Sequence, residues 1–363
     1  GICFLAKTLY HTEVGVLNFH LSLQNEIRSE EEYMVKGKRI WKTFIISLVI
    51  LLMSGCSKNT DHEEINSGRL KIITTLFPQY DFVKEIGKDK VDVNLLLPPG
   101  VESHSYEPTP KDMVDIKNAD IFIYTGEYME PWAKKIADNI EGYNLIITDA
   151  SEGVELLEGH GHEEDEHEGH ENEEDENEDH AHDHSDKDPH IWLDPIYAQK
   201  MIDNITVALT KADKENKEFY IKNAEEYKKQ LDLLDKEIAE ALEKVNSKKV
   251  IYGGHSAFSY FARRYNLEFI TPYNGFSPNA EPTPKMIIEL IKNIEDAGVK
   301  SIFYEELIDP KVAKIISSET GAKMILLHGA HNLSKEEIES DVRYIDIMKG
   351  NLERLKEGLG YEE

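Results

Sequence analysis

Imidazole side chains recur at the carboxyl ends of predicted strands. Three such strands are followed within a few residues by histidine, and these histidines are His104, His255 and the neighbouring pair His328 and His331. Another, His190, stands in Asp-Pro-His-Ile-Trp-Leu-Asp-Pro (188–195), just before a predicted helix. Ligands of open α/β sheets bind outside the carboxyl ends of the strands. Neutral imidazoles that face one cleft suit a borderline cation such as Zn²⁺, whereas Mn²⁺ and Mg²⁺ prefer more carboxylate oxygen.

A second group of histidines lies in a low-complexity insert, residues 158–188, which contains sixteen acidic residues and one lysine. Its seven imidazoles belong to His160, His162, His167, His170, His180, His182 and His184. This composition cannot bury apolar surface, so the insert is expected to be disordered without a ligand. A solvated acidic loop is one interpretation. Weak capture of several metal ions is favoured, because nitrogen donors are closely spaced and carboxylates attract cations.

The overall composition restricts the partners. The chain has 41 Lys and Arg against 70 Asp and Glu, a formal net charge of −29. This argues against nucleic acid and anionic lipid surfaces, since binding to either needs a basic field. The two cysteines, Cys3 and Cys56, are too few for a disulfide framework or a thiolate zinc site.

The segment 34–55 has the layout of a signal peptide, with Met34, basic residues and an apolar run of about ten residues, which is short of the ~20 that span a bilayer. The following Ser-Gly-Cys resembles a bacterial lipobox, so Cys56 is expected to be lipidated. Residues 1–33 are interpreted as a non-native upstream extension, and the polar residues 56–69 as a flexible tether. The protein is therefore expected outside the cytoplasm, held to the bacterial cell membrane by its lipid alone.

From Leu70 onward, predicted strands and helices alternate, which specifies α/β lobes with mostly parallel sheets. Two lobes are expected, at 70–214 and 247–363. The sequence Glu-Pro-Thr-Pro-Lys occurs at 107–111 and again at 281–285. In both copies, proline at the first helical position after a threonine cap predicts a helix start. The repeat therefore supports two related lobes.

Residues 215–246 contain no glycine or proline and place apolar side chains at helical spacing. This pattern predicts one helix of about thirty residues, roughly 45 Å long. A coiled-coil partner is the alternative, but the sequence has no second helical segment of that length. A rigid helix that joins the two lobes is favoured.

Four segments resemble the metal-binding lipoproteins that serve ABC importers, in particular the zinc branch. They are Pro-Pro-Gly-Val-Glu-Ser-His-Ser-Tyr-Glu-Pro-Thr-Pro (98–110), the segment 188–195, Gly-His-Ser-Ala-Phe-Ser-Tyr-Phe-Ala (254–262) and Ala-Glu-Pro-Thr-Pro (280–284). The resemblance covers about residues 70–350. It implies Zn²⁺ held between two lobes by His104, His190 and His255, and an ABC permease as partner. In the manganese branch the third ligand is typically glutamate, so histidine at 255 indicates zinc.

The fourth ligand is where this chain departs from the zinc branch, whose members often place a carboxylate or water after the last strand. Here the loop reads Leu-His-Gly-Ala-His-Asn-Leu (327–333), and alignment on its final leucine favours His331, with His328 second and water third. Glu305 and Glu306 are candidates either to orient a ligand or to cap the next helix. Asp194 is a candidate to hold His190 or to cap a helix at Pro195.

The expected function is a monomeric extracytoplasmic receptor that captures Zn²⁺ with high affinity and delivers it to the permease. The alternative from another class is a zinc-dependent hydrolase, since three histidines plus water also describe a catalytic site. The sequence has no His-Glu-x-x-His and no Gly-x-Ser-x-Gly, which argues against an enzyme. A surface adhesin or metal buffer, and manganese as the metal, are the remaining alternatives.

Overall fold

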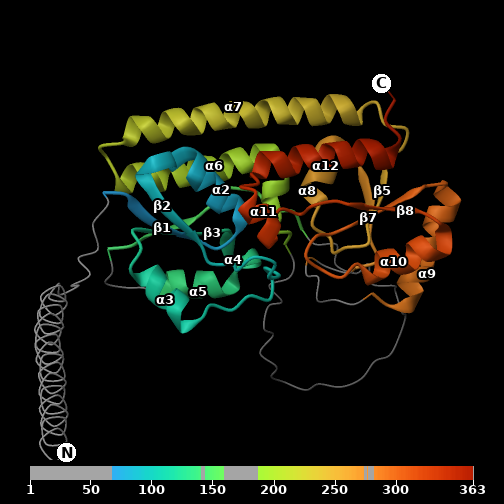
Figure 1. Cartoon of the computed structure of the whole chain (residues 1–363), viewed down its shortest axis with the longest axis horizontal. Coiled ribbons are helices and arrows are strands. Elements are labelled where there is room, and N and C mark those ends of the chain that lie inside the picture. Colours follow the sequence, from blue (N-terminus) through green and yellow to red (C-terminus); the bar gives the residue numbers. More distant parts are fainter. Residues whose placement is uncertain (1–67, 140–143, 159–186, 274–275, 277–281, 363) are drawn as a thin grey trace, which may run out of the picture. The chain divides into compact units, whose positions relative to one another are not determined.

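Parallel sheets form the framework of the chain. The computed structural model describes residues 68–139, 144–158, 187–273, 276 and 282–362 (Figure 1). The predicted signal peptide, Cys56 and the seven histidines of the insert lie outside these residues. Among the described helices, none combines the length and the apolar character that crossing a bilayer requires.

The first lobe carries a four-stranded parallel sheet in the order β2-β1-β3-β4. Its elements are β1 (Leu70–Thr74), α2 (Phe77–Gly87), η1 (Lys88–Lys90), β2 (Val91–Leu95), α3 (Pro110–Lys117), β3 (Ile121–Tyr124), α4 (Gly126–Met129), α5 (Pro131–Asn139), β4 (Ile146–Asp149), η2 (Ile191–Leu193) and α6 (Pro195–Ala212). The register places Ile72 of β1 opposite Val93 on one side and Ile121 on the other. The predicted parallel α/β lobe is thus confirmed.

The second lobe repeats this strand order. After α7 (Lys217–Leu242) come β5 (Lys249–Ile251), α8 (Ser259–Tyr265), β6 (Glu268–Ile270), α9 (Pro284–Ala297), β7 (Ser301–Tyr304), α10 (Lys311–Thr320), β8 (Lys323–Leu326), α11 (Lys335–Glu339) and α12 (Tyr344–Leu359). The parallel pairs β5-β6 and β7-β8 are joined by one parallel bridge between Tyr252 and Phe303. The resulting order, β6-β5-β7-β8, matches that of the first lobe.

Side chains alternate between the two faces of each sheet and so build separate cores. In the first lobe, Ile72 and Ile121 face a core with α2 and α6, whereas Ile73 and Phe122 face a smaller core with α3 and α5. In the second lobe, Ile302 faces α9 and α10. Both sheets are therefore covered by helices on their two faces.

The long helix α7 lies along α6 and α12 and also contacts α2 and α8 (Figure 1). Its buried stripe consists of Tyr220, Ala224, Tyr227, Leu231, Leu234, Ile238, Ala241 and Leu242. These side chains belong to a hydrophobic core that contains residues of both lobes, including Ile72 and Phe303. The predicted linking helix is confirmed, and the shared core fixes the lobes to each other.

Candidate metal centre

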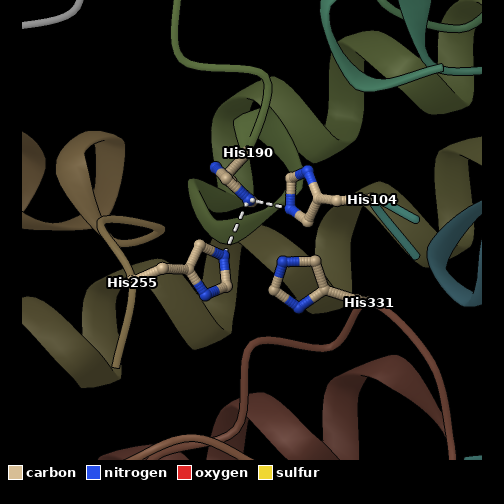
Figure 2. Close-up of side chains that lie close together, drawn as sticks. All are labelled: His104, His190, His255 and His331. Atoms are coloured by element: carbon tan, nitrogen blue, oxygen red, sulfur yellow. Dashed lines mark hydrogen bonds between the residues drawn. The ribbon is translucent and has the colours of Figure 1, made fainter. Parts of the chain in front are cut away.

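Four histidines from four separate segments converge on one point (Figure 2). His104 follows β2, His190 immediately precedes η2, His255 follows β5 and His331 follows β8. The strand-end rule places His255 and His331 at one edge of the second lobe's strands and His104 at the equivalent edge of the first lobe's sheet, and the packing of the two lobes brings these edges together. The group therefore combines two residues from each lobe.

The nitrogen atoms have the spacing of a tetrahedral zinc site. His190 Nε2 lies 3.2 Å from His104 Nε2 and 3.3 Å from His255 Nε2. Zn–N bonds of about 2.0–2.1 Å place tetrahedral ligand atoms about 3.3–3.4 Å apart. One ligand atom from each of the four residues lies within 4.8 Å of the others. The ring centroids are 5.0–5.7 Å apart in all six pairs, so the rings surround the centre evenly.

Burial disfavours the charged form of His104 and His190. His190, His255 and His331 are buried, and His104 is partly buried. Desolvation, followed by the neighbouring imidazoles, lowers the pKa of His104 and of His190 well below the usual value. His331 Nε2 is buried and has no hydrogen-bond partner among the described residues. A buried nitrogen without a partner is costly, and a metal ion at the centre would satisfy it.

His190 is oriented by Asp188, a residue that the sequence had placed within the low-complexity insert. Asp188 Oδ1 accepts hydrogen bonds from His190 Nδ1–H (2.8 Å) and from the His190 backbone N–H (2.9 Å). The proton on Nδ1 leaves the Nε2 lone pair facing the centre. Desolvation raises the pKa of the buried Asp188 carboxyl to about 7. Tyr260 of α8 holds this segment by donating to the Asp188 carbonyl oxygen (2.7 Å).

Two further ligand candidates also contact carboxylates. His255 Nδ1 lies 2.5 Å from Glu305 Oε2, and His331 Nδ1 lies 3.5 Å from Glu306 Oε1. Glu306 Oε2 accepts from the Gly329 backbone N–H (2.7 Å). The structure thus places both glutamates against ligand candidates, and the cap of α10 is Pro310 instead.

His328 points away from the centre. Its Nδ1 accepts from the Ala330 backbone N–H (2.9 Å), and its Nε2 lies 3.3 Å from Glu337 Oε1. Asn351 of α12 binds both its backbone N–H (2.9 Å) and its carbonyl oxygen (2.7 Å). Ala330 has a positive φ of 55°, which turns the chain between His328 and His331. Both histidines of this loop lie near Glu306 Oε1, His328 Nδ1 at 3.4 Å and His331 Nδ1 at 3.5 Å, but only His331 belongs to the converging group.

Asp194 caps a helix and contacts no histidine of the cluster in the described structure. Its Oδ1 accepts from the Ile196 backbone N–H (2.8 Å) at the start of α6 and lies 3.0 Å from Arg264 Nε. Of the two roles expected for Asp194, the geometry favours the helix cap.

The loops that carry His104 and His331 are joined across the lobes. Asn332 Nδ2 donates to the carbonyl oxygens of Pro98 (2.7 Å) and Val101 (2.9 Å). Trp192 of η2 donates from its indole N–H to the Gly329 carbonyl oxygen (2.8 Å) and contacts the rings of His190 and His331. A small cavity of about 20 Å³, lined by residues of both lobes, adjoins the cluster. The centre therefore lies between the lobes, as predicted.

These features define a two-lobed binding protein for a metal cation. The donor group contains only imidazole among the described residues. Four such donors can fill a tetrahedral shell, which leaves no open position for an activated water.

Comparison with known proteins identifies the family. The family model described as zinc-uptake complex component A, periplasmic, matches residues 72–358. The chain is 42% identical to the high-affinity zinc uptake system protein ZnuA of Bacillus subtilis, over 87% of this chain and 96% of that protein. It is 33% identical to the zinc-binding lipoprotein AdcA of Streptococcus pneumoniae, over 86% of this chain but 60% of that longer protein.

A solved zinc-bound structure supports the same family assignment. The Zn(II)-bound ZnuA-like domain of S. pneumoniae AdcA aligns with a TM-score of 0.66 and 32% identity, covering 80% of this chain and 99% of that domain. The chain belongs to the family of zinc-uptake complex components. Its function is therefore that of a zinc-binding component of an uptake system, and the hydrolase alternative is wrong.

Proposed function

We propose that His104, His190, His255 and His331 bind one Zn²⁺ outside the cytoplasm, and that the protein delivers this ion to an ABC permease. The observation that carries the proposal is the convergence of four mostly buried imidazoles with the nitrogen spacing of a tetrahedral zinc site. Zinc is the transported cargo here.

For the fourth ligand we favour His331 over His328 and water. His331 belongs to the converging group of four, whereas His328 does not and instead lies against the Ala330 backbone N–H and the Glu337 carboxylate. Gly329 supports this position, because a Cβ there would lie 2.5 Å from the His331 ring.

The donor set favours zinc over manganese. Four imidazole nitrogens suit Zn²⁺, and the glutamates near the site contact the outer nitrogens of the ligand rings. In that position Glu305 and Glu306 make the imidazoles better donors without entering the coordination shell. Mn²⁺ would gain little from such a site, since it prefers oxygen ligands.

Release of zinc requires a local change. The lobes share one hydrophobic core with α7, which opposes a wide hinge motion. His331 is fixed through Asn332 and Trp192, and His190 through Asp188. His104 is the least buried of the four. Displacement of its loop, which would break the two Asn332 hydrogen bonds to Pro98 and Val101, is the local change that we propose for release.

Attachment to the bacterial cell membrane through a lipid on Cys56 remains part of the proposal, supported by the description of one relative as a lipoprotein. The insert is proposed to collect zinc weakly near the centre. The protein is proposed to act as a monomer.

Alanine substitutions test the proposal. His104→Ala, His190→Ala and His255→Ala should each weaken zinc binding by orders of magnitude in a competition titration with a chromophoric chelator. His328→Ala is the matched control. It removes a buried imidazole from the loop that carries His331, and this imidazole contacts none of His104, His190 and His255. Parent-like affinity in all three variants would place the zinc site elsewhere.

A further inference from the structure

The indole of Trp192 contacts ligand candidates from both lobes. Its ring centroid lies 5.4 Å from that of His190, in the first lobe, and 5.3 Å from that of His331, in the second lobe. Both ring pairs are edge to face. The side chain is fully buried, and its N–H donates to the carbonyl oxygen of Gly329, in the loop that carries His331 (2.8 Å). The position of this one side chain therefore bears on the separation of two imidazoles that belong to different lobes.

A tyrosine of the second lobe holds the backbone of Trp192. Tyr344 is the first residue of α12, and its hydroxyl donates to the Trp192 carbonyl oxygen. The Tyr344 ring is also fully buried and packs on Phe82 of α2, with centroids 5.0 Å apart at 74°. A buried carbonyl oxygen without a donor is costly. This hydrogen bond therefore fixes Trp192 at its backbone, in addition to the bond at its indole.

A buried carboxylate on α2 orients Tyr344 in turn. Asp81 Oδ2 accepts from the Tyr344 backbone N–H (3.2 Å) and from the hydroxyl of Tyr227 on α7 (3.0 Å). The first N–H groups of a helix have no partner within that helix, and a negative group is favoured beside them. Asp81 thus caps α12 from the other lobe and keeps the Tyr344 ring directed at Trp192.

Helix α2 makes two more contacts with the second lobe. The backbone N–H of Phe77, its first residue, donates to the His331 carbonyl oxygen (3.1 Å). One face further along, Glu85 Oε1 lies 2.9 Å from Arg343 Nη2, directly before α12. The contacts from α2 to Tyr344, from Tyr344 to the backbone of η2, and from η2 to the loop of His331 each pass from one lobe to the other. They end at the imidazoles of the metal centre.

We propose that Tyr344 is a positioning residue for zinc, which acts through Trp192 to keep His190 and His331 at the spacing of a tetrahedral shell. The inference rests on the proposed function, because that function makes both histidines ligands. Ligands that are already in place need little ordering when the ion binds, and this raises affinity. Loss of the Tyr344 hydroxyl would allow the indole to shift and would widen the range of nitrogen separations.

A purely structural role is the competing explanation, since Tyr344 and Trp192 belong to the hydrophobic core shared by the two lobes. A structural role predicts a lower free energy of unfolding and unchanged metal coordination. A positioning role predicts that the coordination of the bound ion changes as well. Co²⁺ is the probe that separates them, because its visible absorption depends on the number and arrangement of its ligands.

The test compares Tyr344→Phe with Tyr227→Phe in the full chain. Both variants remove one hydroxyl from the same buried core, but the Tyr227 hydroxyl donates to Asp81 whereas the Tyr344 hydroxyl donates to Trp192. Zinc affinity is measured by chelator competition, stability by thermal unfolding, and coordination by the spectrum with one equivalent of Co²⁺. We expect Tyr344→Phe to weaken zinc binding about tenfold and to reduce the tetrahedral cobalt absorption. Tyr227→Phe should lower stability and keep zinc affinity within about twofold of the parent, with an unchanged spectrum.

Trp192→Phe gives a second measurement. It keeps a ring beside both imidazoles and loses the donor to Gly329, so it should change zinc affinity and the cobalt spectrum in the same direction as Tyr344→Phe.

Parent-like zinc affinity and cobalt absorption in Tyr344→Phe would overturn the proposal. Equal effects of Tyr344→Phe and Tyr227→Phe would do so too, since core stability alone would then explain both. If zinc affinity survives His190→Ala, the proposed zinc site itself is contradicted. The two conclusions can therefore fail separately.

Discussion

Replacement of Asp188 by asparagine tests how the protein prepares His190 for zinc. Asparagine has the same shape, and its Oδ1 can still accept from the His190 Nδ1–H and backbone N–H groups. What is lost is the negative charge beside an imidazole that becomes partly positive when it binds zinc. Hydrogen bonds to charged groups contribute about 1.5–3 kcal/mol, against about 0.5–1.5 for neutral ones. The difference corresponds to a loss of about tenfold in zinc affinity, within the range of about 10–100-fold for such partners.

Asp188→Ala should cost more, about a hundredfold, because it also leaves two buried N–H groups without an acceptor. The pKa of Asp188, about 7 without zinc, adds a second signature. A raised pKa means that the carboxyl is largely neutral below pH 7 and ionised above it. The affinity difference between parent and Asp188→Asn should therefore be larger at pH 8 than at pH 6.

Competition titrations of zinc at both pH values provide the assay. Asp194→Asn is the control, because Asp194 caps α6 and contacts no ligand candidate in the described structure. It should lower stability by up to about 1 kcal/mol and leave zinc affinity unchanged. Parent-like zinc affinity of Asp188→Asn at pH 8 would refute the role given to this carboxylate.

Three further predictions concern the ligands and the insert. His331→Ala should weaken zinc binding less than His104→Ala, and His328→Ala should leave zinc affinity unchanged while it lowers the free energy of unfolding by about 1–3 kcal/mol. Chelator competition measures the zinc affinities, and thermal unfolding measures the stability. If both variants bind zinc like the parent, water is the fourth ligand. Beyond the contribution that Asp188 loses near pH 7, zinc affinity should fall with further acidification below the usual histidine pKa of about 6.5, because protons compete for the imidazole nitrogens, and constant affinity from about pH 6.5 down to pH 5 in titrations would argue against a histidine cage. Deletion of 159–186, which keeps Asp188, should reduce the number of zinc ions bound in calorimetry and preserve one tight site, and loss of that site would show that the insert supplies a ligand.

The sequence predicts the features that follow from local chemistry. His255 and His331 both follow parallel strands of the second lobe and so lie at one edge of it, and His104 lies at the equivalent edge of the first lobe's sheet. The helices that begin at Pro110 and Pro284 do so after threonine caps, as the repeat indicates. The helix caps depend on neighbouring residues alone, and the strand-end placement of the histidines depends only on parallel pairing within each lobe.

Features that depend on distant contacts were not predictable. Asp188 ends a run of acidic residues, so composition could not separate it from the insert, and its burial depends on Tyr260 of α8. The choice between His328 and His331 depends on the turn at Ala330 and on Asn351 of α12. No periodicity within the loop encodes these contacts.

X-ray absorption at the zinc edge tests the central claim most directly. The sample is the chain without residues 159–186, loaded with one equivalent of Zn²⁺, so that the signal reports the interlobe centre. We predict four nitrogen neighbours at about 2.0–2.1 Å with the scattering pattern of imidazole rings. A shell with five or six light atoms, or with more than one carboxylate oxygen, would contradict a four-histidine zinc site.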